Sequence, residues 1–349
     1  MHKIGNISLK NSLILAPMAG GPSTPRLAAA VSNAGGLGSL GCAYESPDQM
    51  QRTIQTTKSL TEKPFAVGLF APLQDPVLNN DQIEKATAAL AIYRKELEIN
   101  TIPSLASPMS IDFDRQFEII LKEAPAAFSF TFGLVPKECI LACRSRKIVT
   151  IGTATTLDEA QLLIDLGVDA IVAQGVEAGG HRGIFSLTGE DPQIKMLDLV
   201  KTLSQTVKTT IIAAGGMMTG QDIRAALNNG AHFAQLGTAF LLCQEAGTSE
   251  TYRTALLNFK NSKTDLTRAF SGRIARGIEN RFLKEMKNKA GSILPFPAQN
   301  NFTRDIRNKA TQLGKSEFLS LWAGEGVAKI RSLSAKDLVE ILWQETSVV

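Results

Sequence analysis

The feature of this sequence that most constrains its fold is a series of eight short apolar segments separated by helix-like segments. The apolar segments lack regular polar alternation, as expected of parallel strands covered on both faces. Eight such units predict an α/β fold of the (β/α)8 TIM-barrel class. The expected strands are residues 13–16, 37–40, 65–70, 126–132, 148–151, 170–174, 210–214 and 232–236. The expected helices are residues 25–33, 47–58, 81–98, 113–122, 137–145, 157–166, 197–203 and 220–228.

The predicted barrel is distinguished from an open doubly wound sheet by its first turn. Such a sheet usually has a Gly-x-Gly-x-x-Gly spacing after strand one, which residues 20–23 lack. After about residue 240 the repeat stops, and the chain becomes more polar. We therefore expect a barrel domain made of residues 1–244 and 304–349. A smaller, mostly helical subdomain, residues 245–303, is expected to lie over the C-terminal mouth of the barrel.

Charge, hydropathy and cysteine usage exclude several functional classes. The net charge is only +4, with no long basic block, so no nucleic-acid partner is expected. No apolar run approaches the length of a bilayer span, and none resembles a signal peptide, so we expect a cytoplasmic protein without a membrane partner. The four cysteines form no Cys-x-x-Cys pair. They are expected to be buried thiols in a reducing compartment, not metal ligands.

The C-terminal ends of the strands form the functional face of such a barrel. Glycines follow the last two strands, at Gly215, Gly216 and Gly237. Main-chain N–H groups there, the Thr238 hydroxyl and a helix N-terminus after it are expected to bind a phosphate, although such glycines could simply end the strands. The strand ends offer no carboxylate pair, nucleophile motif, metal cluster or lysine. A phosphorylated cofactor is therefore expected, and flavin mononucleotide (FMN) fits.

A glycine-rich loop after the sixth strand contains His181, one of three histidines in the chain. Glycines beside it allow main-chain groups to approach a ligand closely. An imidazole there is a candidate catalytic acid or base, while the alternative is a histidine on an ordinary turn. Its place opposite the phosphate-binding loops, near Gln174 and Met18, favours catalysis. Glu177, near His181, is either a solvated or structural carboxylate or a group that supports the site residues from behind.

The strand ends and several later segments together resemble the nitronate monooxygenases, formerly called 2-nitropropane dioxygenases. The matching segments are residues 16–18, 31–38, 174–183, 213–216, 235–238, 271–277 and 321–326. The resemblance implies an FMN enzyme that oxidises alkyl nitronates, such as propionate 3-nitronate, or nitroalkanes with O2 to a carbonyl compound and nitrite. It implies that His181 faces the flavin and substrate. The expected flavin-binding residues are Met18, Gln174, Gly179, Gly180, Gly215, Gly216, Gln235, Leu236, Gly237 and Thr238.

Three positions depart from the family pattern. Gly68 stands in place of an asparagine, Thr131 in place of a histidine that faces the substrate, and Phe296 in place of a tyrosine. These changes leave the substrate open and suggest a bulkier or less anionic one. An FMN-dependent enoyl-[acyl-carrier-protein] reductase using NAD(P)H is the alternative enzyme, and a flavin-binding or phosphate-binding protein without turnover is the alternative class. The expected partners are a small-molecule substrate and O2, and a homodimer is one possible assembly.

Overall fold

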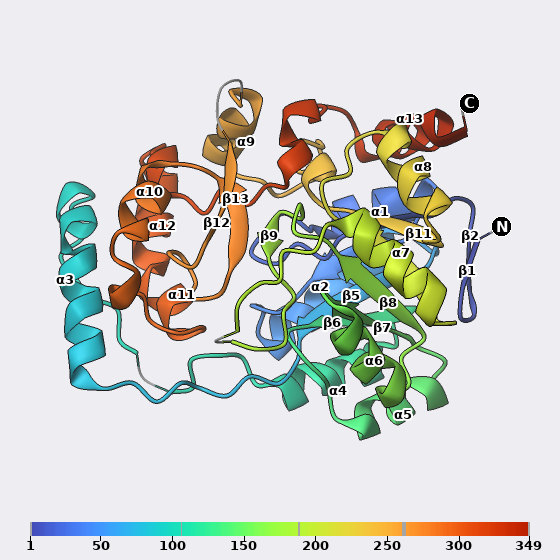
Figure 1. The fold of residues 1–349 in the computed structure, drawn as a ribbon, viewed down its shortest axis with the longest axis horizontal. Helices are drawn as coiled ribbons and strands as arrows, with labels where there is room; N and C mark the ends of the chain where they lie inside the picture. The colour runs from blue at the N-terminus through green and yellow to red at the C-terminus, as the bar shows by residue number, and fades with distance from the viewer. Residues whose placement is uncertain (1, 106, 188, 260–262, 348–349) are drawn as a thin grey trace.

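The computed structural model describes residues 2–105, 107–187, 189–259 and 263–347, and it contains the predicted barrel (Figure 1). Eight parallel strands lie in the order β3-β11-β10-β8-β7-β6-β5-β4. A parallel bridge between Ile14 and Leu37 joins the two ends of this order and closes the barrel. All eight expected strands are confirmed, with small shifts at their ends. They are β3 (Leu13–Leu15), β4 (Gly38–Gly41), β5 (Phe65–Phe70), β6 (Ala127–Thr131), β7 (Val149–Ala154), β8 (Ala170–Gln174), β10 (Thr210–Ala214) and β11 (Phe233–Leu236).

Helices surround the barrel and bury their apolar faces against the strands. Their starts follow local signals: the Thr24 hydroxyl accepts a hydrogen bond from the Leu27 amide at 3.0 Å, and Pro25 occupies the first helical turn. The helices are α1 (Pro25–Asn33), α2 (Pro47–Leu60), α4 (Phe113–Glu123), α5 (Lys137–Ser145), α6 (Leu157–Leu166), α7 (Met196–Thr206), α8 (Gly220–Asn228) and α13 (Ala335–Ser347). The C-terminal α13 packs beside α8 and α1 and so completes the ring, because only a 3-10 turn, η1 (Thr238–Phe240), directly follows β11.

A short antiparallel hairpin closes the N-terminal end of the barrel. Its strands are β1 (His2–Ile4) and β2 (Ile7–Leu9), each only three residues long and therefore too short to be expected from the sequence pattern. Ile4, Ile7 and Leu9 are buried in one cluster with inward-facing residues of the barrel strands, such as Val149 and Phe233. The hairpin therefore seals this end, and the opposite end remains for a ligand.

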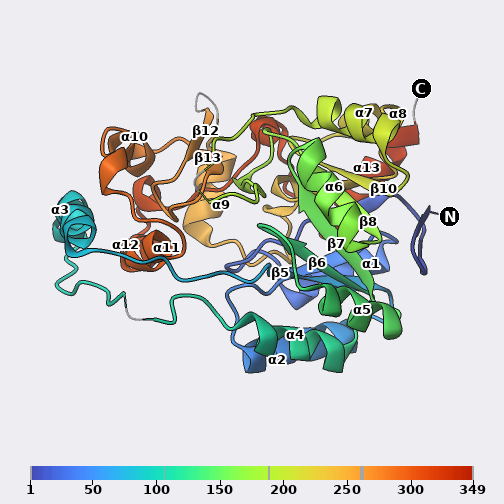
Figure 2. The same cartoon turned by 60° about the horizontal axis from the view of Figure 1, so that its bottom comes forward.

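A second structural unit lies over the C-terminal end of the strands (Figures 1 and 2). It contains a three-stranded antiparallel sheet, in which β13 (Ala275–Ile278) pairs with β12 (Thr264–Thr267) on one side and with β9 (Gly180–His181) on the other. The expectation of a mostly helical unit therefore omitted this sheet. The accompanying helices are α3 (Asn80–Glu96), α9 (Glu250–Leu257), α10 (Arg281–Lys287), α11 (Ala298–Phe302), α12 (Arg304–Gln312), η2 (Ala290–Ser292), η3 (Ser316–Phe318) and η4 (Glu325–Lys329).

This unit has its own hydrophobic core, and residues from outside the range 245–303 also contribute to that core. Leu90 and Tyr93 of α3 belong to it, as do Ile306 and Ala310 of α12. Figures 1 and 2 both show α3 beside α10 and α12, away from the barrel. We therefore propose that α3 and α12 fold with residues 245–303, and we call this combined unit the cap. The expected division of the chain at residues 245 and 303 stays a prediction.

Two further expectations concern the cysteines and membrane-spanning helices. All four cysteine thiols are free and buried, as expected. Within the described ranges, no helix combines the length and the apolar character needed to cross a membrane.

Candidate active site

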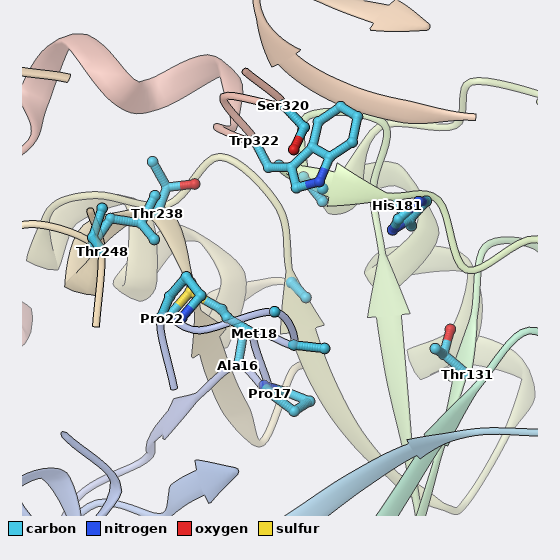
Figure 3. Close-up of a pocket in the computed structure, with 18 of the residues that line it drawn as sticks. Ala16, Pro17, Met18, Pro22, Thr131, His181, Thr238, Thr248, Ser320 and Trp322 are labelled. Carbon is cyan, nitrogen blue, oxygen red and sulfur yellow. The ribbon is translucent and has the colours of Figure 1, made fainter. Parts of the chain in front are cut away.

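A cavity of about 480 Å³ lies between the C-terminal ends of the barrel strands and the cap. Its volume is in the range of small-molecule and cofactor sites. Figure 3 shows Met18, Thr131, His181, Thr238 and Trp322 around this space. Every residue proposed from the sequence for the site lines this one cavity, namely Met18, Thr131, Gln174, Gly179, Gly180, His181, Gly215, Gly216, Gln235, Leu236, Gly237 and Thr238.

The loops after β10 and β11 present unpaired main-chain donors to the cavity. In the described part of the chain, the amides of residues 215–217 and 237–238 donate to no protein acceptor. Gly215 and Gly216 have φ values of 140° and 65°, a backbone region that favours glycine. The Thr238 hydroxyl accepts a hydrogen bond from the Gly324 amide at 3.0 Å and keeps its own hydrogen free. These donors suit a phosphate, and because η1 is a short 3-10 turn, they replace the α-helix N-terminus that the sequence suggested.

His181 is held in place by strand pairing with the cap. It ends the two-residue strand β9, and it is paired with Ala275 of β13. Its Nε2 atom lies 2.8 Å from the Ser271 hydroxyl oxygen. The imidazole is surrounded by aromatic rings, with the Trp322 ring centre at 5.5 Å, Phe132 at 5.8 Å and Phe296 at 6.0 Å. The cap therefore supplies the strand and the hydroxyl that orient the histidine, together with the Phe296 ring, whereas Phe132 follows barrel strand β6 and Trp322 lies beyond α12.

The Ser271 hydroxyl determines which nitrogen of His181 bears the proton. Ser271 can donate to His181 Nε2, at 2.8 Å, or to the Arg273 carbonyl, at 3.2 Å. In the first arrangement His181 Nδ1 is protonated and can donate to a substrate oxygen; in the second Nδ1 has a lone pair and can accept a proton. In the part of the chain that the structure describes, Nδ1 makes no hydrogen bond and is left for a ligand.

The electrostatics keep His181 uncharged. Burial, together with the positive charges of Arg273 and Arg307, lowers its pKa to about 3. The Arg273 guanidinium is itself buried and stacks on the Phe132 ring at 3.8 Å. Phe132 adopts a φ of 78°, an unusual conformation for an aromatic residue, and its ring contacts both Arg273 and the histidine. The site thus contains a neutral imidazole.

We expect turnover of a preformed nitronate to show no inflection near pH 6.5. Because the pKa of His181 is lowered to about 3, its ring remains neutral from about pH 5 to 8. Because the pKa of His181 is lower in the folded protein than in the unfolded chain, the unfolded chain binds this proton more readily. The contribution of His181 to the free energy of unfolding is therefore lost as the pH falls from about 6.5 toward 3. The measurement is the pH profile of kcat/KM with ethyl nitronate. An acid limb between pH 6 and 7 that disappears in His181→Gln would contradict the prediction.

Gln174 positions the His181 loop. Its side-chain oxygen accepts hydrogen bonds from Arg182 at 2.9 Å and from the Gly183 amide at 2.8 Å, and its Nε2 donates to the His181 carbonyl at 3.1 Å. Arg182 is fully buried and forms an ion pair with Asp191 at 2.6 Å. Gln174 can offer a cofactor only its second amide hydrogen, so its flavin-binding role stays a prediction.

Glu177 has a structural role in the described chain. Its carboxylate accepts hydrogen bonds at 2.9 and 3.2 Å from the amide of Met196, the first residue of α7. A carboxylate at a helix N-terminus is a favourable cap. Of the two alternatives that the sequence left open, the geometry supports the structural one.

The departures at Gly68 and Thr131 have different consequences. Thr131 ends β6 and lines the cavity, so a smaller hydroxyl replaces the expected imidazole there. At Gly68 no space is left for an amide, because a Cβ atom would lie 2.6 Å from the Pro17 Cβ and 3.0 Å from the Ser129 hydroxyl. Proline packing therefore occupies the space in which the resemblance led us to expect an asparagine side chain.

We expect Gly68→Ala to destabilise the protein by about 1–3 kcal/mol, the usual cost of overpacking a core. The physical reason is the contact of the new Cβ with Pro17. The shift of the denaturant midpoint measures this cost, and Gly291→Ala is the control, since a Cβ there meets no atom within 4 Å. Equal midpoints for the two variants would show that Pro17 moves aside freely.

Several residues of the site were not identified from the sequence as functional. Tyr44, Arg307 and Trp322 line the cavity, and Ser271 contacts the histidine. Ser271 and Trp322 lie in segments noted only for their resemblance to the family. Tyr44 and Arg307 had no sequence signal, because a single tyrosine or arginine outside a motif is usually a surface residue.

Comparisons with known proteins identify the family. Residues 3–345 match the family described as nitronate monooxygenase. A probable nitronate monooxygenase from Bacillus subtilis (strain 168) is 37% identical over 339 residues, covering 97% of this chain and 96% of that protein. The solved structure of nitroalkane oxidase from Streptomyces ansochromogenes superimposes with a TM-score of 0.91 at 37% identity, covering 97% of this chain and 96% of the other. FabK from Thermotoga maritima is more distant, with a TM-score of 0.74 at 25% identity and coverage of 97% and 93%. This chain therefore belongs to the nitronate monooxygenase family of flavin-dependent oxidoreductases.

Proposed function

We propose that the protein is an FMN-dependent monooxygenase that oxidises alkyl nitronates with O2 to a carbonyl compound and nitrite. The observation that supports this most is the placement of an uncharged His181 in the same cavity as two loops of unpaired main-chain amides. The amides of residues 215–217 and 237–238 would hold the FMN phosphate, with Met18 and Gly180 beside the flavin. When bound, FMN would supply the one-electron chemistry that no side chain in the cavity provides.

His181 is proposed to orient the substrate. With the Ser271 hydroxyl donating to Nε2, the Nδ1–H group can donate to an oxygen of the nitronate anion. A base whose pKa is about 3 is poorly matched to removing a proton from a neutral nitroalkane at neutral pH. We therefore propose the nitronate, more than the nitroalkane, as the substrate form. The aromatic rings of Trp322, Phe132 and Phe296 exclude water from the imidazole.

The test uses purified holoprotein with ethyl nitronate and measures oxygen consumption and nitrite release together. The proposal requires both, with flavin absorbance from bound FMN. The alternative, an enoyl-[acyl-carrier-protein] reductase, requires NAD(P)H-dependent reduction of an enoyl thioester without oxygen. Enoyl reduction without nitrite release would overturn the proposal, and failure to take up FMN would overturn both enzymes. Cytoplasmic location and homodimer formation stay predictions.

A further inference from the structure

Four arginine side chains are buried in the described part of the chain, and one of them lacks a counterion. Three are paired with carboxylates at 2.6 to 3.0 Å, namely Arg94 with Asp305, Arg182 with Asp191, and Arg276 with Glu325. The fourth, Arg273, is 3% exposed and forms no ion pair with any described residue. An uncompensated buried charge is costly, so its presence there has a reason other than stability.

The guanidinium of Arg273 also lacks hydrogen-bond acceptors. Its Nη2 donates to the Ile184 carbonyl, whereas its Nε and Nη1 are buried and have no partner in the described chain. Its flat face stacks on the Phe132 ring at 3.8 Å. Burial and the nearby Arg268 lower the pKa of Arg273 to about 10, with Glu159 acting in the opposite direction. Arg273 therefore remains fully charged at neutral pH.

The carboxylate that acts on Arg273 from a distance is already occupied by other donors. The Oε2 atom of Glu159 accepts hydrogen bonds from the amide and the hydroxyl of Thr155, both at 2.7 Å. Its Oε1 atom accepts from the Phe185 amide, also at 2.7 Å. In the described ranges, no acidic group therefore neutralises Arg273 by direct contact.

The charge of Arg273 acts on the reacting centre. It lowers the pKa of His181 more than the charge of Arg307 does, although Arg307 lines the cavity. The Phe132 ring, on which Arg273 stacks, contacts the His181 ring with the centres 5.8 Å apart. The turn that contains Arg273 also contains Ser271, whose hydroxyl lies 2.8 Å from His181 Nε2. Arg273 is not among the described residues that line the cavity, so it acts across the ring and not by contact.

The oxidative step of the proposed reaction is where such a charge has the largest effect. A nitronate enters the cavity as an anion, and its negative charge is only transferred when it gives up an electron. O2 enters without charge and becomes an anion when it takes an electron. A preorganised positive charge stabilises a transition state most where negative charge develops. His181 is neutral and cannot supply this charge.

We propose that Arg273, across the Phe132 ring, provides the uncompensated charge that stabilises superoxide as it forms beside His181. This inference rests on the proposed function. In this step one electron passes from the reduced flavin to O2, which becomes superoxide, and no proton or leaving group moves. Arg273 is then a positioning residue of the oxidative step, while His181 orients the nitronate.

The test measures the reaction of O2 with holoprotein whose flavin has been reduced by light, without any substrate. In Arg273→Met a side chain of similar length remains against Phe132, but the charge is lost. We expect the second-order rate constant for O2 to fall about 10- to 100-fold, the size of effect that one partly screened charge has on a barrier. The limiting rate of anaerobic flavin reduction by ethyl nitronate should change less than about threefold, because negative charge only moves within the cavity.

The stability of Arg273→Met distinguishes this role from a structural one. If Arg273 served the fold, its loss would lower the free energy of unfolding. Because its buried charge is uncompensated, we expect the denaturant midpoint of the variant to equal or exceed that of the parent. A lower midpoint together with a lower rate constant would assign Arg273 a structural role and overturn the proposal.

Arg273→Lys adds a test by pH. Burial lowers the pKa of a lysine, so this variant has the charge at low pH and loses it as the pH rises. Its rate constant for O2 should approach the parent's at low pH and fall toward that of Arg273→Met at high pH. The parent rate should stay constant to about pH 9, since the pKa of Arg273 is about 10. The other groups that face this position, Arg268, Glu159 and His181, are the same in both proteins. A rate that equals that of Arg273→Met at every pH would contradict the proposal.

The matched control is Arg268→Met, in the same segment of the cap. Arg268 supports the same loop as Arg273, because it donates to the carbonyls of Leu187 and Gly189 at 3.0 and 3.2 Å. Its charge is not among those that act on His181. We expect its rate constant for O2 to stay within about threefold of the parent's. Equal losses in the two variants would show that loop support matters and would overturn the proposal.

Reduction by light separates this inference from the proposed function. If Arg273→Met reacts slowly with O2 and the parent releases no nitrite from ethyl nitronate, the proposed function fails and the effect of Arg273 on O2 stands. If the parent releases nitrite and Arg273→Met reacts with O2 at the parent's rate, the role of Arg273 fails and the proposed function stands.

Discussion

Replacing His181 with alanine is expected to lower nitronate turnover about 100-fold or more, because the group that orients the nitronate is lost, while bound FMN is retained. His181 is the imidazole whose Nδ1 is left for a ligand in the cavity, and its pKa of about 3 keeps it in the neutral form throughout the assay range. The main-chain amides proposed for the FMN phosphate lie in other loops and are not altered. Steady-state nitrite release and the flavin absorbance of the purified variant measure the two quantities.

The control for this variant is His232→Ala. His232 immediately precedes β11, at the other end of the strand from the cavity, and its Nδ1 accepts a hydrogen bond from the Ile211 amide at 3.1 Å. We expect its turnover to stay within about threefold of the parent. Unchanged turnover in His181→Ala would remove the histidine from the mechanism. Loss of FMN in that variant would instead make His181 a cofactor-binding residue.

Replacing Asp191 with asparagine is expected to lower the free energy of unfolding by about 3–5 kcal/mol, because it removes one partner of a buried ion pair. Arg182 is completely buried, and its Nε lies 2.6 Å from the Asp191 carboxylate. Its Nη1 also donates to the Gly175 carbonyl at 2.6 Å and to the Gln174 side chain at 2.9 Å. A neutral amide in place of the carboxylate would leave the guanidinium charge without compensation, and the loop before His181 would lose its support. Denaturant unfolding of the holoprotein measures the change.

The same substitution at an exposed ion pair is the control. Asp81 and Lys85 form a pair at 2.7 Å with side chains that are 68% and 58% exposed, so Asp81→Asn is expected to change stability by less than about 0.5 kcal/mol. If Asp191→Asn lowered the free energy of unfolding no more than Asp81→Asn does, the burial of Arg182 would not depend on its ion pair with Asp191. Turnover of Asp191→Asn should also fall, since Gln174 and Arg182 together position the His181 loop.

The barrel could be predicted because each of its units has signals within a short window of sequence. Thr24 and Pro25 begin α1, and Gly167 ends α6 with a φ of 92°. The apolar strands between such signals are long enough to recognise. The N-terminal hairpin and β9 were missed, because strands of two or three residues have no detectable period.

The sequence of α3 alone does not show whether this helix packs against the barrel or in the cap. It follows β5 in the chain, so it was expected to be a barrel helix. Leu90 and Tyr93 instead pack in the cap core, and α4 packs against the barrel. Both helices have an apolar face, and which partner each face finds depends on the lengths and paths of the connecting loops.

The sequence by itself determined the barrel, the glycine loops at its C-terminal end and His181 as the candidate catalytic residue. Only the tertiary structure decided what surrounds that histidine: Ser271 at Nε2, the rings of Phe132 and Trp322, and the charge of Arg307. Strand ends converge whenever parallel strands close into a barrel, so their residues could be grouped in advance. Contacts between the cap and the barrel join segments far apart in the chain, and their pairing depends on packing that no local pattern encodes.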